Sequence, residues 1–410
     1  MTGLVSRIVQ ANEGRLPLLL RRKYDEMAQD AFAFYRGTAH LFFGDLEPSR
    51  LPKSPVTWCS GDLHLENFGT FKGDNGLAYF DVNDFDEACL LPISWDLARF
   101  ATSVWVAGPA LKLNAIARRT AVRTFLTEYQ HQLAEGKARW LERATAEGPV
   151  RELLRQLRNR TSAMLLEKRT IRKRTGLRIR DDGRYALPIS KAQRKAAFQL
   201  VSECRHPQPA FEPVDAARRI AGLGSLGLDR YVVLVRHKDD TRRYEVLDVK
   251  ESRPSAAAVH RARTQPRWPS EAARVIEVQR RSQAAAPAFL SVGVLDGKSY
   301  VIRQLQPLED RLDLQDIVGR QKAFRCVLES MARVVAWDHL RSAGRQGASP
   351  VDDLIEFGQS EPWISGLASY AERYGKQVEK DHKKFARALK ARKVPIPADK
   401  PERAAAAPAD

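Results

Sequence analysis

Two acidic segments of the chain have the residue types and the spacing that phosphoryl transfer requires. In residues 60–67, SGDLHLEN, an aspartate stands five positions before an asparagine, and residues 83–87, NDFDE, add a second group of carboxylates. Phosphoryl transfer needs one carboxylate that orients an attacking hydroxyl and accepts its proton, and it needs amide and carboxylate oxygens that hold Mg²⁺ against the phosphates. We expect Asp62 to be the catalytic carboxylate and Asn67 and Asp84 to bind the metal.

Further polar residues near these segments are expected to support the same site. Asp81 and Asp86 are additional candidates for metal binding or positioning. Asp96 and Arg99 are expected to brace the site through hydrogen bonds near the start of a helix. His64 has two interpretations, a substrate contact and a structural role, and the structural role is favoured.

Three other interpretations apply to the acidic segments. Asp and Asn in polar turns often only cap backbone amides, but two such clusters at the ends of successive strands favour the chemical interpretation. A calcium-binding loop is excluded because Phe85 stands where the fifth ligand would be and no glycine follows at the sixth position. A zinc site is excluded because His64 has no partner at helical spacing.

Short predicted strands and one helix carry the acidic segments. Residues 56–59 and 78–82 are rich in residues that favour strands, and turn-forming residues at 72–76 separate them, so we expect a hairpin. The apolar spacing that follows predicts a helix over 94–107, with Ser94 as its N-cap and Asp96 in its first turn.

A glycine-rich segment far downstream has the composition of a phosphate-binding loop. Residues 222–227, GLGSLG, precede predicted strands at 231–235 and 244–249, and Lys250 follows the second strand. Such a loop lets backbone amides approach phosphates, and a lysine adds a point charge. A dinucleotide-binding fold would need a helix after the glycines, whereas strands suit the hairpin that covers the nucleotide in kinases. The alternative is a flexible turn. The loop residues expected at the nucleotide are Gly222, Gly224, Ser225 and Gly227.

A predicted helix over 270–285 supplies a possible partner for Lys250. Glu277 is the first choice and Glu271 the second, and the alternative is that both are surface glutamates. Two more predicted strands, 289–295 and 299–305, turn at an Asp-Gly pair and complete a small sheet. The chain after the second of these strands would contact the adenine through backbone groups.

The remaining segments are predicted to be mainly helical. Residues 21–46, 316–340 and 362–389 have apolar residues at helical spacing. Residues 151–184 are dense in Arg and Lys, and they are either a solvated connection, which is favoured, or a basic patch that faces a ligand. Residues 395–410 consist of Pro, Ala and charged residues and are expected to be a disordered tail.

Composition limits the class of protein and of partner. The chain has 410 residues, and its 68 Lys and Arg exceed its 50 Asp and Glu by 18, which favours phosphorylated ligands, nucleic acid or anionic surfaces. Four scattered cysteines without a CxxC pair argue against a zinc ribbon or a disulfide framework. No apolar run reaches the ~20 residues that span a bilayer, so we expect no membrane insertion and a cytoplasmic protein.

The motifs resemble those of known families. Residues 60–67 and 83–88, followed by WDLA at 95–98, are similar to the catalytic and metal-binding segments of aminoglycoside and choline phosphotransferases. Nearly the whole chain resembles the uncharacterised bacterial family called domain of unknown function 2252, which is grouped with kinase-like folds. The segments that carry this second resemblance are FYRG at 34–37, GDLHLENFG at 61–69, NDFDE at 83–87, VKE at 249–251 and RQL at 303–305.

The resemblance implies an α+β protein-kinase-like fold of two lobes, with ATP and Mg²⁺ as cofactors. It implies that Lys250 contacts the α- and β-phosphates. Kinases place the glycine loop before the catalytic loop, whereas Asp62 here precedes Gly222, so circular permutation is expected. A second departure is Ser60, which stands where phosphotransferases usually carry a histidine that supports the catalytic loop.

The expected organisation has four segments: 1–213 with the catalytic loop, 214–306 as the small sheet, 307–394 as C-terminal helices, and the tail from 395 to 410. The expected function is ATP- and Mg²⁺-dependent transfer to a hydroxyl of an unknown, possibly anionic, small acceptor. The alternatives are a nucleotide-binding pseudokinase with a regulatory role and a basic nucleic-acid-binding protein, which is not favoured.

Overall fold

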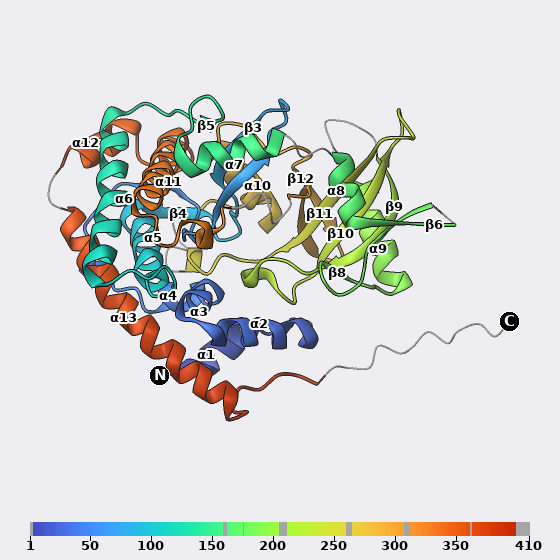
Figure 1. Cartoon of the computed structure of the whole chain (residues 1–410), viewed down its shortest axis with the longest axis horizontal. Helices are drawn as coiled ribbons and strands as arrows, with labels where there is room; N and C mark the ends of the chain where they lie inside the picture. The colour runs from blue at the N-terminus through green and yellow to red at the C-terminus, as the bar shows by residue number, and fades with distance from the viewer. Residues whose placement is uncertain are drawn as a thin grey trace.

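The protein is a mixed α+β structure with several separate sheets, which confirms the predicted class. The computed structural model describes residues 3–158, 162–174, 176–204, 211–259, 265–306, 312–360 and 363–398. Figure 1 shows the largest sheet at one end of the molecule and the long helices at the other. The predicted tail at 395–410 lies outside the described residues from residue 399 onward.

The N-terminal helices are shorter than the sequence predicts. The predicted helix over 21–46 is divided into α2 (Pro17–Gln29), α3 (Ala31–Gly37) and α4 (Ala39–Gly44), and α1 (Leu4–Ala11) precedes them. The first break lies at Asp30, which has an extended backbone and accepts a hydrogen bond from the amide of Ala33 at 2.8 Å. An N-cap side chain of this kind starts a new helix where apolar spacing alone predicts continuation.

The predicted hairpin is wrong in its partners. Strand β1 (Val56–Cys59) pairs with β4 (Cys89–Pro92), whereas β3 (Ala78–Val82) pairs with β2 (Phe68–Lys72) across the predicted turn. A short strand, β5 (Leu141–Glu142), extends the second sheet beside β3. The intervening strand β2 was missed, and it is the true partner of β3.

A buried helix follows β4 and organises the helical end of the molecule. Every residue of α5 (Ile93–Ala107) is buried, and its N-cap is Pro92, so the predicted Ser94 cap is wrong by two positions. Asp96 lies in the first turn as predicted. The surrounding helices, several of which are visible together at one end of Figure 1, are α6 (Ala115–Glu135), α11 (Gln321–Ser342), α12 (Val351–Gln359) and α13 (Trp363–Lys390). Within this group α13 packs on α5 and α11 packs on α6.

The large sheet has six antiparallel strands in the order β12-β13-β11-β10-β9-β8. Its strands are β8 (Ala186–Leu187), β9 (Phe211–Arg219), β10 (Arg230–His237), β11 (Tyr244–Ser252), β12 (Ser291–Leu295) and β13 (Lys298–Gln304). The β10–β11 and β12–β13 hairpins and the helix α10 (Glu271–Ser282), capped by Ser270, confirm the predicted elements. Helix α9 (Lys191–Ser202) packs on β9 and β12 of this sheet.

The basic segment is structured over most of its described length. It contains α7 (Gly148–Arg158), α8 (Ser162–Arg169) and a small hairpin of β6 (Thr170–Lys173) and β7 (Gly176–Ile179). The guanidinium of Arg169 stacks 3.6 Å from the ring centroid of Tyr185. Among the described residues, no helix combines the length and the hydropathy needed to cross a bilayer.

Candidate functional site

The catalytic candidate Asp62 follows β1 and is held by an arginine from the buried helix α5. Both Nε and Nη2 of Arg99 lie 2.7–2.8 Å from Asp62 Oδ1, and Arg99 stacks 3.7 Å over the ring of Tyr35. Burial raises the pKa of Asp62, and the nearby carboxylate of Asp84 adds to this effect while Arg99 opposes it. Asp62 still keeps 21% of its side chain exposed, so it remains accessible to an acceptor.

Asn67 connects the two acidic segments. Its side-chain nitrogen donates hydrogen bonds to the carbonyl oxygens of Asp62 and Asp84, each at 3.1 Å. Its own carbonyl accepts a bond from the amide of Asn83 at 3.0 Å. Because the amide nitrogen of the side chain is used in this way, the side-chain oxygen is the atom that can coordinate a cation.

Lys250 reaches the second acidic segment from the large sheet. Its ammonium lies 2.9 and 3.1 Å from the two carboxylate oxygens of Asp84 and 2.5 Å from Asp86, although Asp84 and Lys250 are 166 residues apart in the sequence. Burial alone would raise the pKa of Asp84, but Lys250, with Arg303 and Arg230, outweighs it and holds the pKa well below its usual range. Burial and the charge of Asp84 raise the pKa of Asp86.

A buried ion cluster, which sequence reasoning missed, lies next to Lys250 on the sheet. Asp248 accepts hydrogen bonds from Arg230 at 2.7 and 2.9 Å and lies 2.5 Å from Arg219. Arg230 also donates to the carbonyl of Ala221 and to the hydroxyl of Ser225, both at 2.9 Å. The cluster therefore ties the glycine-rich loop to the strand that carries Lys250. Single arginines in a basic chain gave no signal of it.

The glycine-rich loop lies between β9 and β10, where the sequence predicts it. Gly222 and Gly227 have φ angles of +73° and +88°, which a side chain would strain. The hydroxyl of Ser225 donates to Gly222 at 3.2 Å, so it folds the loop on itself. Gly224 accepts a hydrogen bond from Lys23 of α2 at 3.3 Å. Burial, with the charges of neighbouring arginines, lowers the pKa of Lys23 well below its usual range.

A carboxylate that sequence reasoning did not select, Glu87, lies beside the catalytic loop. Gly61 packs so closely on the carbonyl of Glu87 that any side chain at position 61 would collide with it. The carboxylate of Glu87 accepts a hydrogen bond from the amide of Ala256 at 2.6 Å. Burial and the charge of Asp62 raise the pKa of Glu87 to about 7. The turn after β1 and the segment before β4 therefore pack together, and their carboxylates lie near one another.

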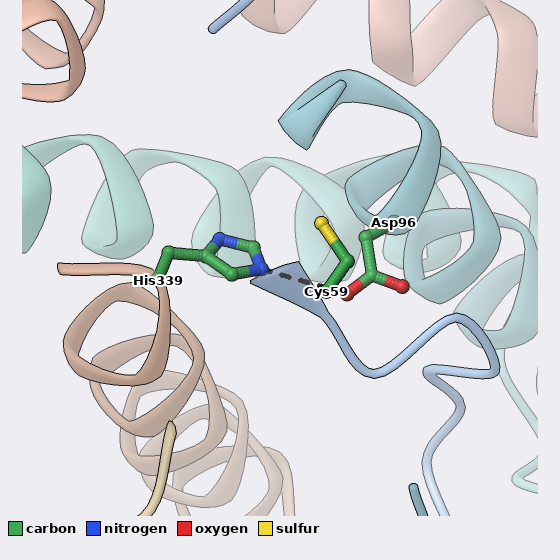
Figure 2. A group of neighbouring side chains, drawn as sticks. All are labelled: Cys59, Asp96 and His339. Carbon is green, nitrogen blue, oxygen red and sulfur yellow. Dashed lines mark ion pairs between the residues drawn. The ribbon is translucent and has the colours of Figure 1, made fainter. Parts of the chain in front are cut away.

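Asp96 braces the loop that carries Asp62 through hydrogen bonds near the start of α5, as predicted. Its two oxygens accept hydrogen bonds from the amides of Ser60 and Gly61, each at 3.2 Å. Figure 2 shows His339 of α11 pointing at the same carboxylate, with Nε2 3.5 Å from Asp96 Oδ2, and Cys59 beside them. A histidine therefore does support this loop, but it comes from a distant helix and not from position 60.

The group in Figure 2 also has the residue types of a metal site, since one ligand atom of each residue lies within 4.8 Å of the others. The hydrogen bonds favour a structural role. The carboxylate of Asp96 already accepts two backbone amides, and His339 Nδ1 lies 2.8 Å from the hydroxyl of Tyr129. Burial raises the pKa of the Cys59 thiol well above its usual range, whereas metals bind the thiolate. We interpret the group as a brace for the loop.

The predicted pair between Glu277 and Lys250 is not formed among the described residues. Glu277 pairs with Arg281 one turn further along α10 at 3.0 Å and keeps 42% of its side chain exposed. Glu271, the second choice, pairs with Arg274 at 2.7 Å. Both are local helix pairs. Lys250 instead takes its counter-charges from the acidic segment at 84–86.

Two other candidates lie apart from Lys250. Asp81 of β3 is buried, forms a hydrogen bond with the side chain of Asp338 of α11, and accepts the amide of Val82 at 2.8 Å. His64 accepts a hydrogen bond from the amide of Glu66 at its Nδ1 atom. Its ring also meets that of Phe32 edge-on at 6.2 Å between centroids. The contacts of His64 hold the turn after Asp62.

The Asp81–Asp338 pair should make stability depend on pH. Burial raises the pKa of Asp81 to about 6, above the ordinary value of about 3.9, so the folded state binds a proton that the unfolded state has lost. Stability from this group is present at low pH and is lost as the pH rises through 6. We therefore expect Asp81→Asn to raise the free energy of unfolding at pH 7 by about 1–3 kcal/mol and to change it less at pH 5.

Urea unfolding at both pH values measures this effect, and Asp74→Asn, at an exposed turn position, is the matched control. The same small change at pH 5 and pH 7 for Asp81→Asn would show that the two carboxyl groups do not share a proton.

Comparison with known proteins adds a family but no activity. The sequence model of a family described as "Uncharacterized protein conserved in bacteria (DUF2252)" matches residues 15–388. No curated protein matches the chain, and no solved structure matches it. The matched region contains both acidic segments, the glycine-rich loop and Lys250.

Proposed function

The chain belongs to the bacterial family DUF2252, and we propose that it is an ATP- and Mg²⁺-dependent phosphotransferase with a circularly permuted kinase-like architecture. The observation that carries the proposal is the contact of Lys250 with Asp84 and Asp86, beside Asn67 and Asp62. A lysine from a sheet that also bears a glycine-rich loop faces carboxylates next to a candidate base. Phosphoryl transfer uses groups of these types around the phosphates: a lysine, metal-binding carboxylate and amide oxygens, and a base.

The residues present fit a magnesium ion. Carboxylate and amide oxygens are the ligands that Mg²⁺ prefers, and Asp84, Asp86 and the side-chain oxygen of Asn67 supply them. The ammonium of Lys250 contacts both carboxylates, at 2.9 and 2.5 Å, and a positive group at this position supports the proposal of a metal there. When bound, Mg²⁺ would neutralise charge on the phosphate oxygens. With Mg²⁺ at these carboxylates, the ammonium of Lys250 would be free to contact the phosphates from the large sheet.

The residues of the chain have distinct tasks in the proposed reaction. Amides of residues 222–227 and the ammonium of Lys250 hold the phosphates of ATP. Asp62 Oδ2 accepts a hydrogen bond from the acceptor hydroxyl while Arg99 keeps Oδ1 in place. The hydroxyl oxygen forms a bond to the γ-phosphorus, the bond from that phosphorus to the bridging oxygen breaks, ADP leaves with the electron pair, and the proton passes to Asp62.

One observation favours a nucleotide-binding pseudokinase as the second candidate. Arg99 is fully buried and binds Asp62 through two nitrogens, and an ion pair of this kind reduces the basicity of the carboxylate. Burial has the larger effect on Asp62 and raises its pKa, which is the direction a general base needs. The enzyme is therefore preferred, and turnover distinguishes it from the pseudokinase.

Calorimetric titration of Mg²⁺-ATP into the wild type, Lys250→Ala and Asp84→Ala tests the proposal. We expect the wild type to bind, and each variant to bind about tenfold or more weakly because a charge-assisted contact is lost. For Asp84→Ala the affinity should also lose its dependence on Mg²⁺.

Glu277→Ala is the matched control, since the one ion pair of Glu277 among the described residues joins it to Arg281 across one turn of α10, and its loss should leave the affinity unchanged. A folded wild type that does not bind millimolar Mg²⁺-ATP would refute both the enzyme and the pseudokinase. Binding without transfer to any hydroxyl compound would favour the pseudokinase.

A further inference from the structure

The N-terminal segment lies directly against the glycine-rich loop. The amide of Leu16 donates to the carbonyl of Gly227 at 2.8 Å, and Arg15 Nη1 donates to Leu226 at 2.6 Å. A side chain at position 227 would meet the Cβ atom of Arg15 at 2.8 Å, so this approach requires glycine. Lys23, about two turns further along α2, completes the contact by donating to Gly224 at 3.3 Å.

Lys23 is a buried lysine with no carboxylate partner among the residues that the structure describes. Only 2% of the residue is exposed, and its one hydrogen bond among the described residues goes to the neutral carbonyl of Gly224. No ion pair joins it to a described Asp or Glu. An uncompensated buried charge is costly, and proteins normally pair such a group or use it to bind an opposite charge. The position therefore lacks a negative group.

The charged groups around Lys23 include residues of the candidate site. Electrostatic interactions reach Lys23 from Asp62 and Glu87 on the acidic side and from Arg15 and Arg253 on the other side. Two further polar atoms of the N-terminal segment are buried without a hydrogen-bond partner among the described residues. They are Arg15 Nε and the hydroxyl of Tyr24. Lys23 thus contacts the glycine-rich loop and feels the charge of the candidate base.

We infer that Lys23 binds the terminal phosphate of the nucleotide, the group that is transferred. This inference rests on the proposed function. Lys250 lies at the carboxylates of the metal segment, whereas Lys23 contacts Gly224 of the glycine-rich loop and is within electrostatic reach of Asp62. A cation there can meet the phosphate that is held by the loop and directed at the acceptor. A flexible four-carbon stem lets the ammonium leave the carbonyl of Gly224 for a phosphate oxygen. The positive charge is then placed where negative charge develops during transfer.

The test compares a triphosphate with a diphosphate. Titration of Mg²⁺ with a non-hydrolysable ATP analogue, and separately with ADP, is measured for the wild type, Lys23→Met and Lys23→Arg. We expect Lys23→Met to weaken binding of the analogue about tenfold or more, with ADP affinity within about twofold of wild type, because only the analogue has the terminal phosphate. Lys23→Arg keeps the charge and should retain most of the preference for the triphosphate.

Thermal unfolding separates this role from a structural one. Methionine has a similar length and removes a desolvated charge, so Lys23→Met should unfold no earlier than the wild type. Arg22→Met is the control for loss of a cation from α2, because Arg22 is exposed and, within the part of the chain that the structure describes, pairs with Glu26 alone.

Equal weakening of both ligands by Lys23→Met, or no weakening of either, would overturn the inference while the proposed function stands. A folded wild type that binds neither ligand would overturn both the inference and the proposed function. A Lys23→Met protein that unfolds early, together with a Lys23→Arg protein that keeps the triphosphate preference at wild-type stability, would still support phosphate binding through the charge. Early unfolding of both variants without a change in that preference would assign Lys23 to the fold.

Discussion

Asp62→Asn is expected to lower the rate of phosphoryl transfer by about 10²- to 10⁴-fold, the contribution usual for a positioned general base. Affinity for Mg²⁺-ATP should stay within about twofold, since Asp62 contacts the acceptor and not the nucleotide. Asparagine has nearly the same shape, and its oxygen can still accept the hydrogen bonds from Arg99 that aspartate accepts. The loss is therefore specific to the proton acceptor. Single-turnover transfer from labelled ATP measures it.

Asp45→Asn is the matched control, because Asp45 forms an ion pair with Arg7 at 2.7 Å outside the site. The pH dependence gives a second readout. Burial raises the pKa of Asp62, so the rate should fall on the acid side at a pH above about 4, the ordinary range of a carboxyl group. A variant that transfers phosphate at the wild-type rate would remove Asp62 from the mechanism.

Local sequence signals selected segments that the structure places close together. Carboxylates, an asparagine and glycines recur at short spacing in the two acidic segments and the glycine-rich loop. Turn-forming residues beside them predict where the neighbouring strands end, including the strand before Lys250. The structure brings Asp62, Asn67, Asp84, Asp86 and Lys250 together in one region. Their roles remain predictions. Their proximity is an observation, and it could not be read from the sequence, in which Asp84 and Lys250 are 166 residues apart.

Long-range partners could not be predicted in the same way. Glu277 was chosen for Lys250 because it lies in the next helix, but an Arg281 one turn away is always within its reach. Asp248 is an ordinary strand residue in the sequence, and only β-sheet register places Arg230 and Arg219 around it. Lys23 belongs to a helix with other basic residues, and only tertiary packing buries it against Gly224.

The strand pairing shows the same limit. Residues 56–59 and 78–82 were correctly predicted as strands, but the missed strand at 68–72 pairs with the second of them. Residues 68–72 contain Gly69 and end in Lys72, so their composition is that of a loop as much as a strand. The consequence is functional, because the long connection from β1 to β2 leaves room for the turn that carries Asp62 and Asn67.

Asp96→Ala is expected to have the largest effect on stability, with a loss of about 2–6 kcal/mol in the free energy of unfolding, since two buried amides lose their acceptor at about 1–3 kcal/mol each. Asp96 is fully buried in α5, and its oxygens hold Ser60 and Gly61. Urea unfolding measures the loss. Asp352→Ala is the control, because Asp352 lies exposed in the first turn of α12. Its substitution removes only a favourable charge at the helix N-terminus.

The same variant tests whether the fold and the site are linked. Asp62 follows Gly61 directly, so a loop without its carboxylate brace should lose transfer activity even at temperatures where the protein stays folded. Asp96→Asn keeps one acceptor oxygen and should lie between wild type and Asp96→Ala in both measurements. If Asp96→Ala unfolds no earlier than Asp352→Ala, the amides of Ser60 and Gly61 do not depend on it. If it is less stable but transfers phosphate normally, the brace serves the fold alone.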